Sequence, residues 1–300
     1  MTGTKKPGPG ILEQISSAGP LISDGATGTW LQSHGLEPGG CPEEMNATQP
    51  QLVKKMAEEY FEAGSDLVLT TSFGGNRFML KKYGHENRVR EFNLLSADHA
   101  KSQAPQLGFV VGSVGPTGEF IEPLGNVSEL EMQDAFAEQI TALSEGGADA
   151  ILIETMYSIE ESTLAIKATK ENTELPVMAT MTFDKGPRGF FTMMGTTPRQ
   201  AAKDLVKSGA DVVGANCGNG IETMLEIAKE MRSATTAPIL IHSNAGIPDI
   251  RQGQIVYPET PEFMATYFKY MSGLGIDIIG GCCGTTPRHI RAMSEAIKSG

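Results

Sequence analysis

Residues 146–155 read Gly-Gly-Ala-Asp-Ala-Ile-Leu-Ile-Glu-Thr and contain the kind of junction on which the fold prediction rests. The glycines can end a preceding helix in the left-handed conformation, in which other residues are strained. The apolar run that follows is typical of a strand buried on both faces. The segment therefore predicts a turn that leads from a helix into a parallel sheet.

The same junction recurs three times along the chain. Ala63-Gly64-Ser65-Asp66, Ser208-Gly209-Ala210-Asp211 and Leu274-Gly275-Ile276-Asp277 each precede another apolar strand. We expect all four turns at the lower end of one sheet, where their aspartates have a structural rather than a functional role.

Eight predicted strands alternate with helical patterns from one end of the chain to the other. The strands are residues 21–24, 66–73, 109–114, 150–155, 177–183, 212–217, 239–244 and 277–282. Amphipathic helical stretches include residues 51–63, 130–145, 199–207, 222–232 and 262–271. This α/β pattern fits a closed (β/α)8 TIM barrel in a single domain. We assign residues 1–18 to an N-terminal extension and residues 19–300 to the barrel.

A doubly wound open sheet is the alternative for alternating strands and helices. It would need a phosphate-binding turn after the first strand, where residues 24–29 read Asp-Gly-Ala-Thr-Gly-Thr. These glycines are spaced GxxG, which does not match the GxGxxG fingerprint of dinucleotide-binding folds. The barrel is therefore the favoured fold.

The chain has 300 residues, four cysteines and a formal net charge of −12 at pH 7. Its acidity argues against a nucleic-acid partner, which would require a basic surface. No apolar run approaches the ~20 residues that cross a bilayer, so we expect no membrane partner. The cysteine content, together with an N-terminus that lacks a secretory pattern, predicts a reducing, cytoplasmic location.

Three of the four cysteines lie at predicted strand ends. Residues 280–287 read Gly-Gly-Cys-Cys-Gly-Thr-Thr-Pro, and residues 214–218 read Gly-Ala-Asn-Cys-Gly. The carboxyl ends of barrel strands converge on the face where active sites lie. Cys217, Cys282 and Cys283 therefore predict a zinc site with one position open for substrate, as in catalytic zinc centres.

Two alternatives to a zinc site remain for these thiols. An adjacent cysteine pair can form a strained vicinal disulfide, or it can simply pack beside the sheet as small apolar side chains do. Ordinary burial is our interpretation of Cys41, which lies in a loop-like segment.

Polar side chains collect at the same predicted strand ends. Asp24 and Glu154 each follow apolar residues, so both carboxylates should be sheltered and should need a hydrogen-bonding or cationic partner. A substrate ammonium group would be such a partner, and a capping or ion-pair role is the alternative. His242, inside a strand, is interpreted as a hydrogen-bonded core residue rather than a fourth metal ligand.

Residues 24–29, 70–78, 214–218 and 280–287 resemble the homocysteine S-methyltransferase family, and within it the homocysteine-binding domain of the cobalamin-dependent methionine synthases. The resemblance extends over nearly the whole chain. It implies that the three strand-end cysteines bind zinc and that Asp24 and Glu154 hold the ammonium group of homocysteine. The other substrate-pocket residues that we expect on this basis are Gly25, Thr71, Ser72, Asn216 and Asn244.

The resemblance implies an enzyme that activates the homocysteine thiol for methyl transfer, giving methionine. The free thiol, with a pKa near ~8.5 by analogy with cysteine, is mostly protonated at neutral pH, and zinc favours its thiolate. Residues 76–84 are similar to those of corrinoid-dependent relatives, which implies methylcobalamin or a separate corrinoid protein as methyl donor. The alternatives are a corrinoid-protein methyltransferase that demethylates another substrate and a non-catalytic zinc or redox thiol protein.

Overall fold

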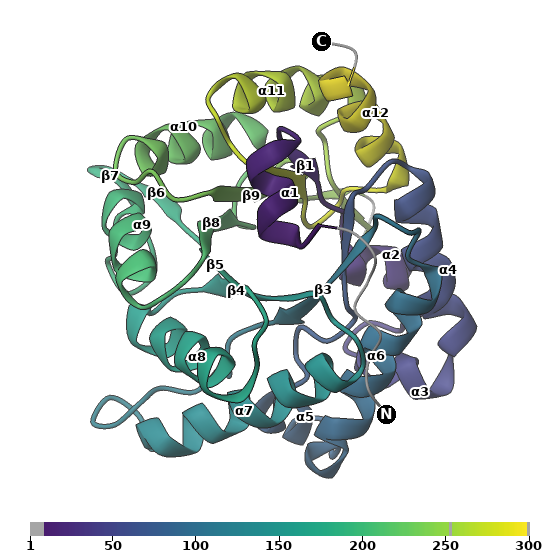
Figure 1. The fold of residues 1–300 in the computed structure, drawn as a ribbon, viewed down its shortest axis with the longest axis vertical. Coiled ribbons are helices and arrows are strands. Elements are labelled where there is room, and N and C mark those ends of the chain that lie inside the picture. Colours follow the sequence, from purple (N-terminus) through teal and green to yellow (C-terminus); the bar gives the residue numbers. More distant parts are fainter. Residues whose placement is uncertain (1–8, 252–253, 299–300) are drawn as a thin grey trace.

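The computed structural model describes residues 9–251 and 254–298 and shows parallel strands ringed by helices (Figure 1). The barrel strands are β1 (Leu21–Ile22), β2 (Leu67–Leu69), β3 (Phe109–Val114), β4 (Ala150–Met156), β5 (Val177–Met181), β8 (Val212–Asn216), β9 (Ile239–Ser243) and β12 (Ile278–Gly281). They form one eight-stranded sheet in the order β1-β12-β9-β8-β5-β4-β3-β2. The first strand pairs with the last, which confirms the predicted (β/α)8 barrel.

Helices other than α1 surround the sheet on its outer side (Figure 1). The helices are α1 (Ile11–Ser17), α2 (Thr27–Ser33), α3 (Met45–Thr48), α4 (Pro50–Glu62), α5 (Arg77–Lys81), α6 (Val89–Gln103), α7 (Glu129–Glu145), α8 (Ile159–Asn172), α9 (Pro198–Lys207), α10 (Ile221–Arg232), α11 (Pro261–Gly273) and α12 (Pro287–Lys298), with a short 3-10 helix, η1, at Glu86–Arg88. The five predicted helices are all present and begin one residue earlier than expected. The capping side chains of Ser128, Thr197 and Thr260 set three of those starts.

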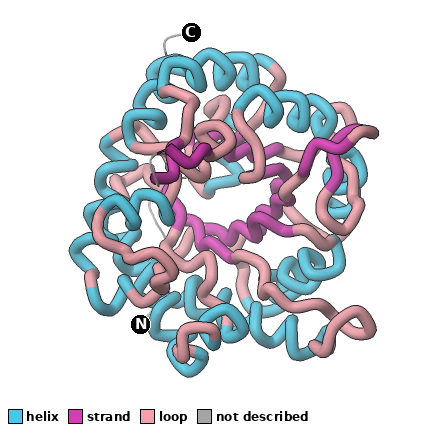
Figure 2. Tube along the Cα trace, turned by 180° about the vertical axis from the view of Figure 1, so that it is seen from behind, coloured by secondary structure: helices cyan, strands magenta, loops and turns pink. Residues whose placement is uncertain are grey.

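The strands differ from the prediction mainly at their carboxyl ends. Residues 66–73 were expected as a strand, but β2 ends at Leu69, and Ser72 N donates to Thr70 O in a tight turn. Two hairpins were not expected: β6 (Asp184–Gly186) with β7 (Gly189–Phe191), and β10 (Asp249–Arg251) with β11 (Gln254–Val256). They follow β5 and β9 and lie beside the ring of strands in Figure 2.

The recurring aspartates bind neighbouring strands together at the lower end of the barrel. One carboxylate oxygen of each accepts a backbone N–H of the preceding strand over 2.8 Å, in the pairs Asp66–Ile22, Asp149–Val110, Asp211–Val177 and Asp277–Ile239. Each aspartate also forms an ion pair with a lysine or arginine near the end of a helix, in the pairs Lys298–Asp66, Lys101–Asp149, Lys170–Asp211 and Arg232–Asp277. Their structural role is thereby confirmed.

These contacts divide the barrel into four similar two-strand units. The glycine of each turn has a positive φ, between 73° at Gly275 and 104° at Gly64. This is the left-handed conformation that we expected where a glycine ends a helix. The sheet order contains no ladder between β1 and β2. Single hydrogen bonds join these two strands instead: Asp66 N donates to Ile22 O, the Asp66 carboxylate accepts from Ile22 N, and Asp24 Oδ2 accepts from Leu69 N over 2.7 Å.

The barrel interior has an apolar lower layer and a polar upper layer. Side chains of the lower layer include Leu21, Leu67, Phe109, Val111, Leu152, Met178, Val212, Leu240 and Ile278. Two positions further along a strand the side chain returns to the same face. The buried residues at those positions include Ser113, Glu154, Thr180 and His242. The sequence therefore places polar groups at the carboxyl end of the barrel and an apolar core beneath them.

Helix α1 lies across the ring of strands in Figure 1. Its Ile11 and Ile15 belong to the same apolar cluster as the lower barrel layer. The division that we expect between residues 18 and 19 thus falls between this helix and the strands that it covers. Residues 1–8 of the expected extension lie outside the described residues.

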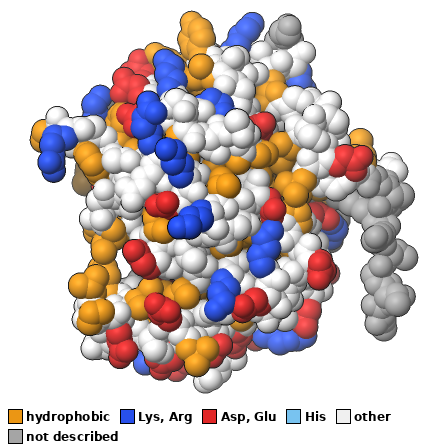
Figure 3. Space-filling model, turned by 60° about the vertical axis from the view of Figure 1, so that its left-hand side comes forward, with side chains coloured by type: hydrophobic (Ala, Val, Ile, Leu, Met, Phe, Trp, Pro, Cys, Tyr) orange, Lys and Arg blue, Asp and Glu red, His pale blue; other side chains and the backbone are white. Residues whose placement is uncertain are grey.

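Charged side chains of both signs are interspersed on the molecular face drawn in Figure 3. Within residues 9–251 and 254–298, no helix has both the length and the apolar character that crossing a membrane would require.

We predict that Asp211→Ala destabilises the barrel by about 1–3 kcal/mol, because it leaves Val177 N–H and Lys170 without their partner. Lys170→Ala removes only the partly exposed ion pair and should cost less than about 1 kcal/mol. Urea unfolding of both variants measures the difference. Equal losses would show that the ion pair, rather than the bond to the backbone, is what matters.

Candidate metal centre and substrate pocket

Three thiols lie together at the carboxyl end of the barrel. Cys217 follows β8, and Cys282 and Cys283 follow β12. Their sulfur atoms all lie within 4.8 Å of one another, and those of Cys217 and Cys283 are 3.9 Å apart. All three are free cysteines, since a disulfide would bring two sulfurs to about 2 Å. Tetrahedral zinc with bonds of ~2.3 Å separates two sulfur ligands by about 3.8 Å, so the spacing suits that ion.

Backbone hydrogen bonds hold the cysteines against the end of β9. Cys217 N donates to His242 O over 3.1 Å, and Cys282 N donates to Ser243 O over 2.7 Å. Cys217 has a φ of 62°, a left-handed conformation that costs a non-glycine residue about 1–3 kcal/mol. The strained turn brings its thiol to those of the neighbouring strand end.

The pKa values of the three thiols shift in different directions: that of Cys217 is lowered, and those of Cys282 and Cys283 are raised. Hydrogen bonds with Cys282 and Cys283 lower the pKa of Cys217 to about 3. The pKa of Cys283 is raised to about 12 by the hydrogen bond between Cys283 and Cys217 and by burial. The first thiolate is thus stabilised by its neighbours, while its charge opposes the next ionisation. A cation among the three sulfurs would remove that opposition, because metal ligands bind as thiolates.

Two further side chains reach the thiols. Asn244 hydrogen-bonds to Cys217, and its Oδ1 has no partner among the described residues. Tyr257, which follows β11, donates to Cys283 and packs against Gly284, where an added Cβ would lie 2.0 Å from the ring. Tyr257 was not among the site residues expected from the sequence. No signal identified it, because it follows a short hairpin outside the eight repeating units.

Asp24 and Glu154 form a buried acidic pair, only 2 % and 7 % exposed. Asp24 Oδ2 accepts a hydrogen bond from Leu69 N, and Glu154 Oε1 accepts one from Ser113 Oγ over 2.5 Å. Burial raises the pKa of each to about 7, and the charge of Glu154 also raises that of Asp24. In the described part of the chain, no lysine or arginine offsets either carboxylate. A cationic ligand group would therefore find two unpaired acids here.

Asn216 connects the acidic pair to the thiols. Its Nδ2 donates to Glu154 Oε2 over 3.2 Å and to Thr155 Oγ1 over 2.7 Å. Its Oδ1 accepts from Thr155 N and from Thr180 Oγ1. Thr155 has a φ of 60°, so this one side chain fixes a second strained turn as well as a carboxylate. Because Asn216 directly precedes Cys217, the carboxylate and the thiol are held by adjacent residues.

Ser113 and Thr180 were also missed by the sequence analysis. Both lie inside predicted strands rather than at their ends. The alternation of inward positions along each strand is the signal that could have found them.

Three other expected pocket residues follow β1 and β2. An added Cβ at Gly25 would lie 2.7 Å from Thr285 Oγ1, so no side chain fits there. Thr71 is 2 % exposed, and its hydroxyl has no hydrogen-bond partner among the described residues. Ser72 Oγ, in contrast, donates to Ser113 O over 2.7 Å. Of the two hydroxyls, only that of Thr71 is therefore left without a hydrogen-bond partner among the described residues.

Cys41 and His242 were expected to be core residues, and both are buried. Cys41 belongs to a separate apolar cluster with Leu80, Val89 and Phe92. His242 lies in the polar layer of the barrel, and burial lowers its pKa to about 3. We expected hydrogen bonds to its ring, but its Nε2 has none with the described residues.

A family model described as homocysteine S-methyltransferase matches residues 21–297 of the chain. The methionine synthase of Mycobacterium tuberculosis H37Rv is 31% identical over 306 aligned residues, which cover 95% of this chain and 25% of the relative. The methionine synthase of Mycobacterium leprae is 30% identical over 297 residues, with 92% and 24% covered. The chain thus spans about a quarter of the length of these relatives.

Solved structures show the same fold. The metallated form of the homocysteine methyltransferase MmuM from Escherichia coli matches with a TM-score of 0.76 at 21% identity, covering 93% of this chain and 97% of that one. A 3-dehydroquinate dehydratase from Geobacillus kaustophilus matches with a TM-score of 0.54 at 12% identity, covering 94% and 92%.

Asp24→Asn should change how stability depends on pH. Burial raises the pKa of Asp24 from 3.8 to about 7, so the fold favours the protonated acid. The contribution of Asp24 to the free energy of unfolding is therefore fully present below pH ~4 and is lost as the pH rises through 7. From pH 5 to pH 8 the free energy of unfolding should fall by roughly 2.5 kcal/mol more in the wild type than in the variant. Urea unfolding of the metal-free proteins measures both slopes, and equal slopes would contradict the shift.

Proposed function

Because the chain belongs to the homocysteine S-methyltransferase family, we propose that it activates the thiol of homocysteine for methyl transfer, giving methionine. One observation carries the proposal: three free thiols and two unpaired buried carboxylates share one end of the barrel. The thiols suit a metal ion, and the carboxylates suit the α-ammonium group of an amino acid.

Cys217, Cys282 and Cys283 would hold the zinc ion of such an enzyme. Three thiolate ligands leave a fourth tetrahedral position, which is the arrangement of catalytic zinc sites. When bound, zinc lowers the pKa of a coordinated thiol and so supplies a thiolate nucleophile at neutral pH. A reducing compartment keeps such cysteines free, and we therefore propose a cytoplasmic location.

Asp24 and Glu154 would bind and orient the amino end of homocysteine. Their carboxylates are already fixed by Leu69, Ser113 and Asn216, so little rearrangement is needed when an ammonium group arrives. The ammonium charge favours the ionised carboxylates and lowers their pKa values from about 7. The pocket would then prefer an α-amino thiol to a simple thiol, which a zinc store or redox sensor has no reason to do.

We propose methylcobalamin or a methylcorrinoid protein as the donor. The similarity of residues 76–84 to corrinoid-dependent relatives supports this. The length of the methionine synthase relatives, about four times that matched by this chain, is compatible with a separate donor module.

A cavity formed mainly by the segments that follow β3 and β4 favours a second candidate donor. It has a volume of about 460 Å³, and its lining includes Glu119, Glu122, Phe120 and Tyr157. Burial raises the pKa of Tyr157, as do the charges of Cys217, Asp184 and Cys283. Carboxylates and aromatic rings favour a small organic cation, such as a sulfonium or quaternary ammonium compound.

We predict one zinc per chain and methyl transfer to homocysteine that requires all three ligands. Cys282→Ala should lose most of the zinc and the activity, whereas Cys41→Ala, in a separate cluster, should keep both. Metal analysis and a methyl-transfer assay with methylcobalamin, betaine or S-methylmethionine measure these outcomes and identify the donor. Full zinc occupancy in Cys282→Ala would contradict the ligand assignment.

Glu154→Gln should weaken homocysteine binding by about ten- to a hundredfold, because a charge-assisted hydrogen bond is worth roughly 1.5–3 kcal/mol. Zinc content should not change. The matched comparison is a des-amino thiol of the same length, whose affinity the variant should retain. Calorimetric titration of both thiols measures this, and an equal loss for the two would mean that Glu154 supports the fold or metal site instead.

A further inference from the structure

The loop between β2 and α5, residues 70–76, carries Thr71 and Ser72, two of the pocket residues expected from the sequence. It has no regular secondary structure, yet buried side chains from three helices, α3, α6 and α7, form hydrogen bonds with its backbone. Asn46 Nδ2 donates to Thr71 O over 2.8 Å, Gln139 Nε2 donates to Ser72 O over 2.7 Å, and Asn93 Nδ2 donates to Gly75 O over 2.8 Å. The position of Thr71 therefore depends on residues that do not line the pocket.

Glu43 is the one carboxylate among these buried anchors. Its Oε1 accepts Gly74 N over 2.7 Å, and the Cys41 thiol lies 3.4 Å from Oε2. The loop backbone lies directly against it, since an added Cβ at Gly74 would be 3.1 Å from Oε1. Glu43 is 3 % exposed, and burial raises its pKa.

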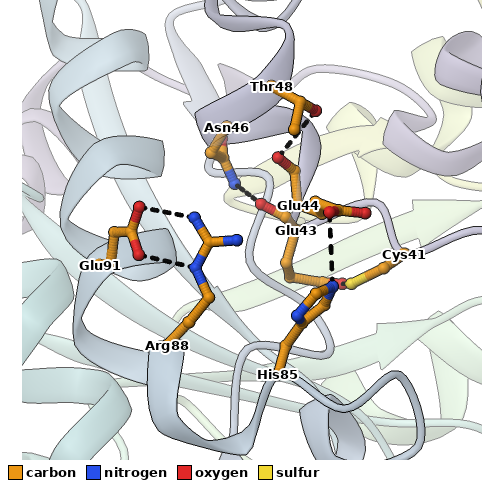
Figure 4. Close-up of polar contacts among 8 residues, drawn as sticks. All are labelled: Cys41, Glu43, Glu44, Asn46, Thr48, His85, Arg88 and Glu91. Atoms are coloured by element: carbon orange, nitrogen blue, oxygen red, sulfur yellow. Dashed lines mark hydrogen bonds and ion pairs between the residues drawn. The ribbon is translucent and has the colours of Figure 1, made fainter.

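The surroundings of Glu43 offer it no counter-ion. Figure 4 shows its side chain extending toward Cys41, while the neighbouring Glu44 turns toward His85. The arginine in the same view, Arg88, is paired with Glu91. Within residues 9–251 and 254–298 no cation contributes to the pKa of Glu43. Burying a carboxylate without a counter-ion costs free energy. At this place the hydrogen bond that Glu43 accepts from the loop backbone has to offset that cost.

We propose that Glu43 is a positioning residue for the homocysteine pocket: its carboxylate fixes the loop that carries Thr71, whose buried hydroxyl has no partner among the described residues. Glu43 itself touches no substrate. The identity of the ligand rests on the proposed function, whereas the anchoring of the loop does not.

The contact can be changed from both sides. Glu43→Ala removes the acceptor of Gly74 N–H, and Glu43→Gln keeps an acceptor of the same length without the charge. Gly74→Ala leaves Glu43 in place and presses a methyl group on its carboxylate. Glu44→Ala is the matched control, because it removes an adjacent glutamate whose partner is His85.

Two measurements on the zinc-loaded full chain test the proposal: the dissociation constant of homocysteine, and hydrogen–deuterium exchange of residues 70–76 without ligand. Glu43→Ala should weaken homocysteine about tenfold and speed exchange in this loop, with unchanged zinc content. Glu43→Gln should recover most of the affinity, and Glu44→Ala should match the wild type. If Glu43→Ala does not fold, Gly74→Ala should give the same two changes.

Unchanged loop exchange in the folded Glu43→Ala or Gly74→Ala protein would overturn the proposal, whatever its activity. Faster exchange with unchanged homocysteine affinity would overturn the link to the pocket. If the wild type binds no homocysteine while Glu43→Ala still speeds exchange, the anchoring is supported and the proposed function fails instead.

Discussion

Closure of a parallel sheet into a ring is the constraint on which the site depends. The ladders pair Asn216 of β8 with His242 of β9, and His242 with Gly280 of β12. Residues that are far apart in the sequence thus end their strands at one height. The four aspartate contacts at the lower end help to fix this register, and the thiols and carboxylates at the upper end follow from it.

The upper layer of the barrel holds more polar groups than its own stability requires. Glu154 is satisfied by Ser113 and Asn216, but its pKa and that of Asp24 remain raised to about 7 because burial is not offset by a cation. Proteins retain such unfavourable groups mainly at functional sites, where a ligand supplies the missing partner. The strained turns at Thr155 and Cys217 are in the same small region, which is consistent with that explanation.

Loops, rather than strands, carry several of the residues around the thiols and the proposed pocket, and contacts to the rest of the barrel fix these loops. Tyr257 reaches Cys283 from beyond a hairpin, and the loop that carries Thr71 is held by Asn46 and Glu43. A rigid barrel with separately anchored loops allows the site to vary while the fold stays the same. This separation agrees with the fold-level match to proteins of other activities.

The sequence by itself determined the eight strands, the turns with their aspartates, and the cysteines and carboxylates at strand ends, because each depends on local periodicity or a short motif. Only the tertiary structure decided that the three sulfurs lie within 4.8 Å, that Asn216 joins Glu154 to Thr155, that Tyr257 bonds to Cys283, and that Glu43 bonds to Gly74. These contacts join segments separated by dozens of residues. No local pattern encodes such contacts, since they arise from the closure of the ring and from the packing of its loops.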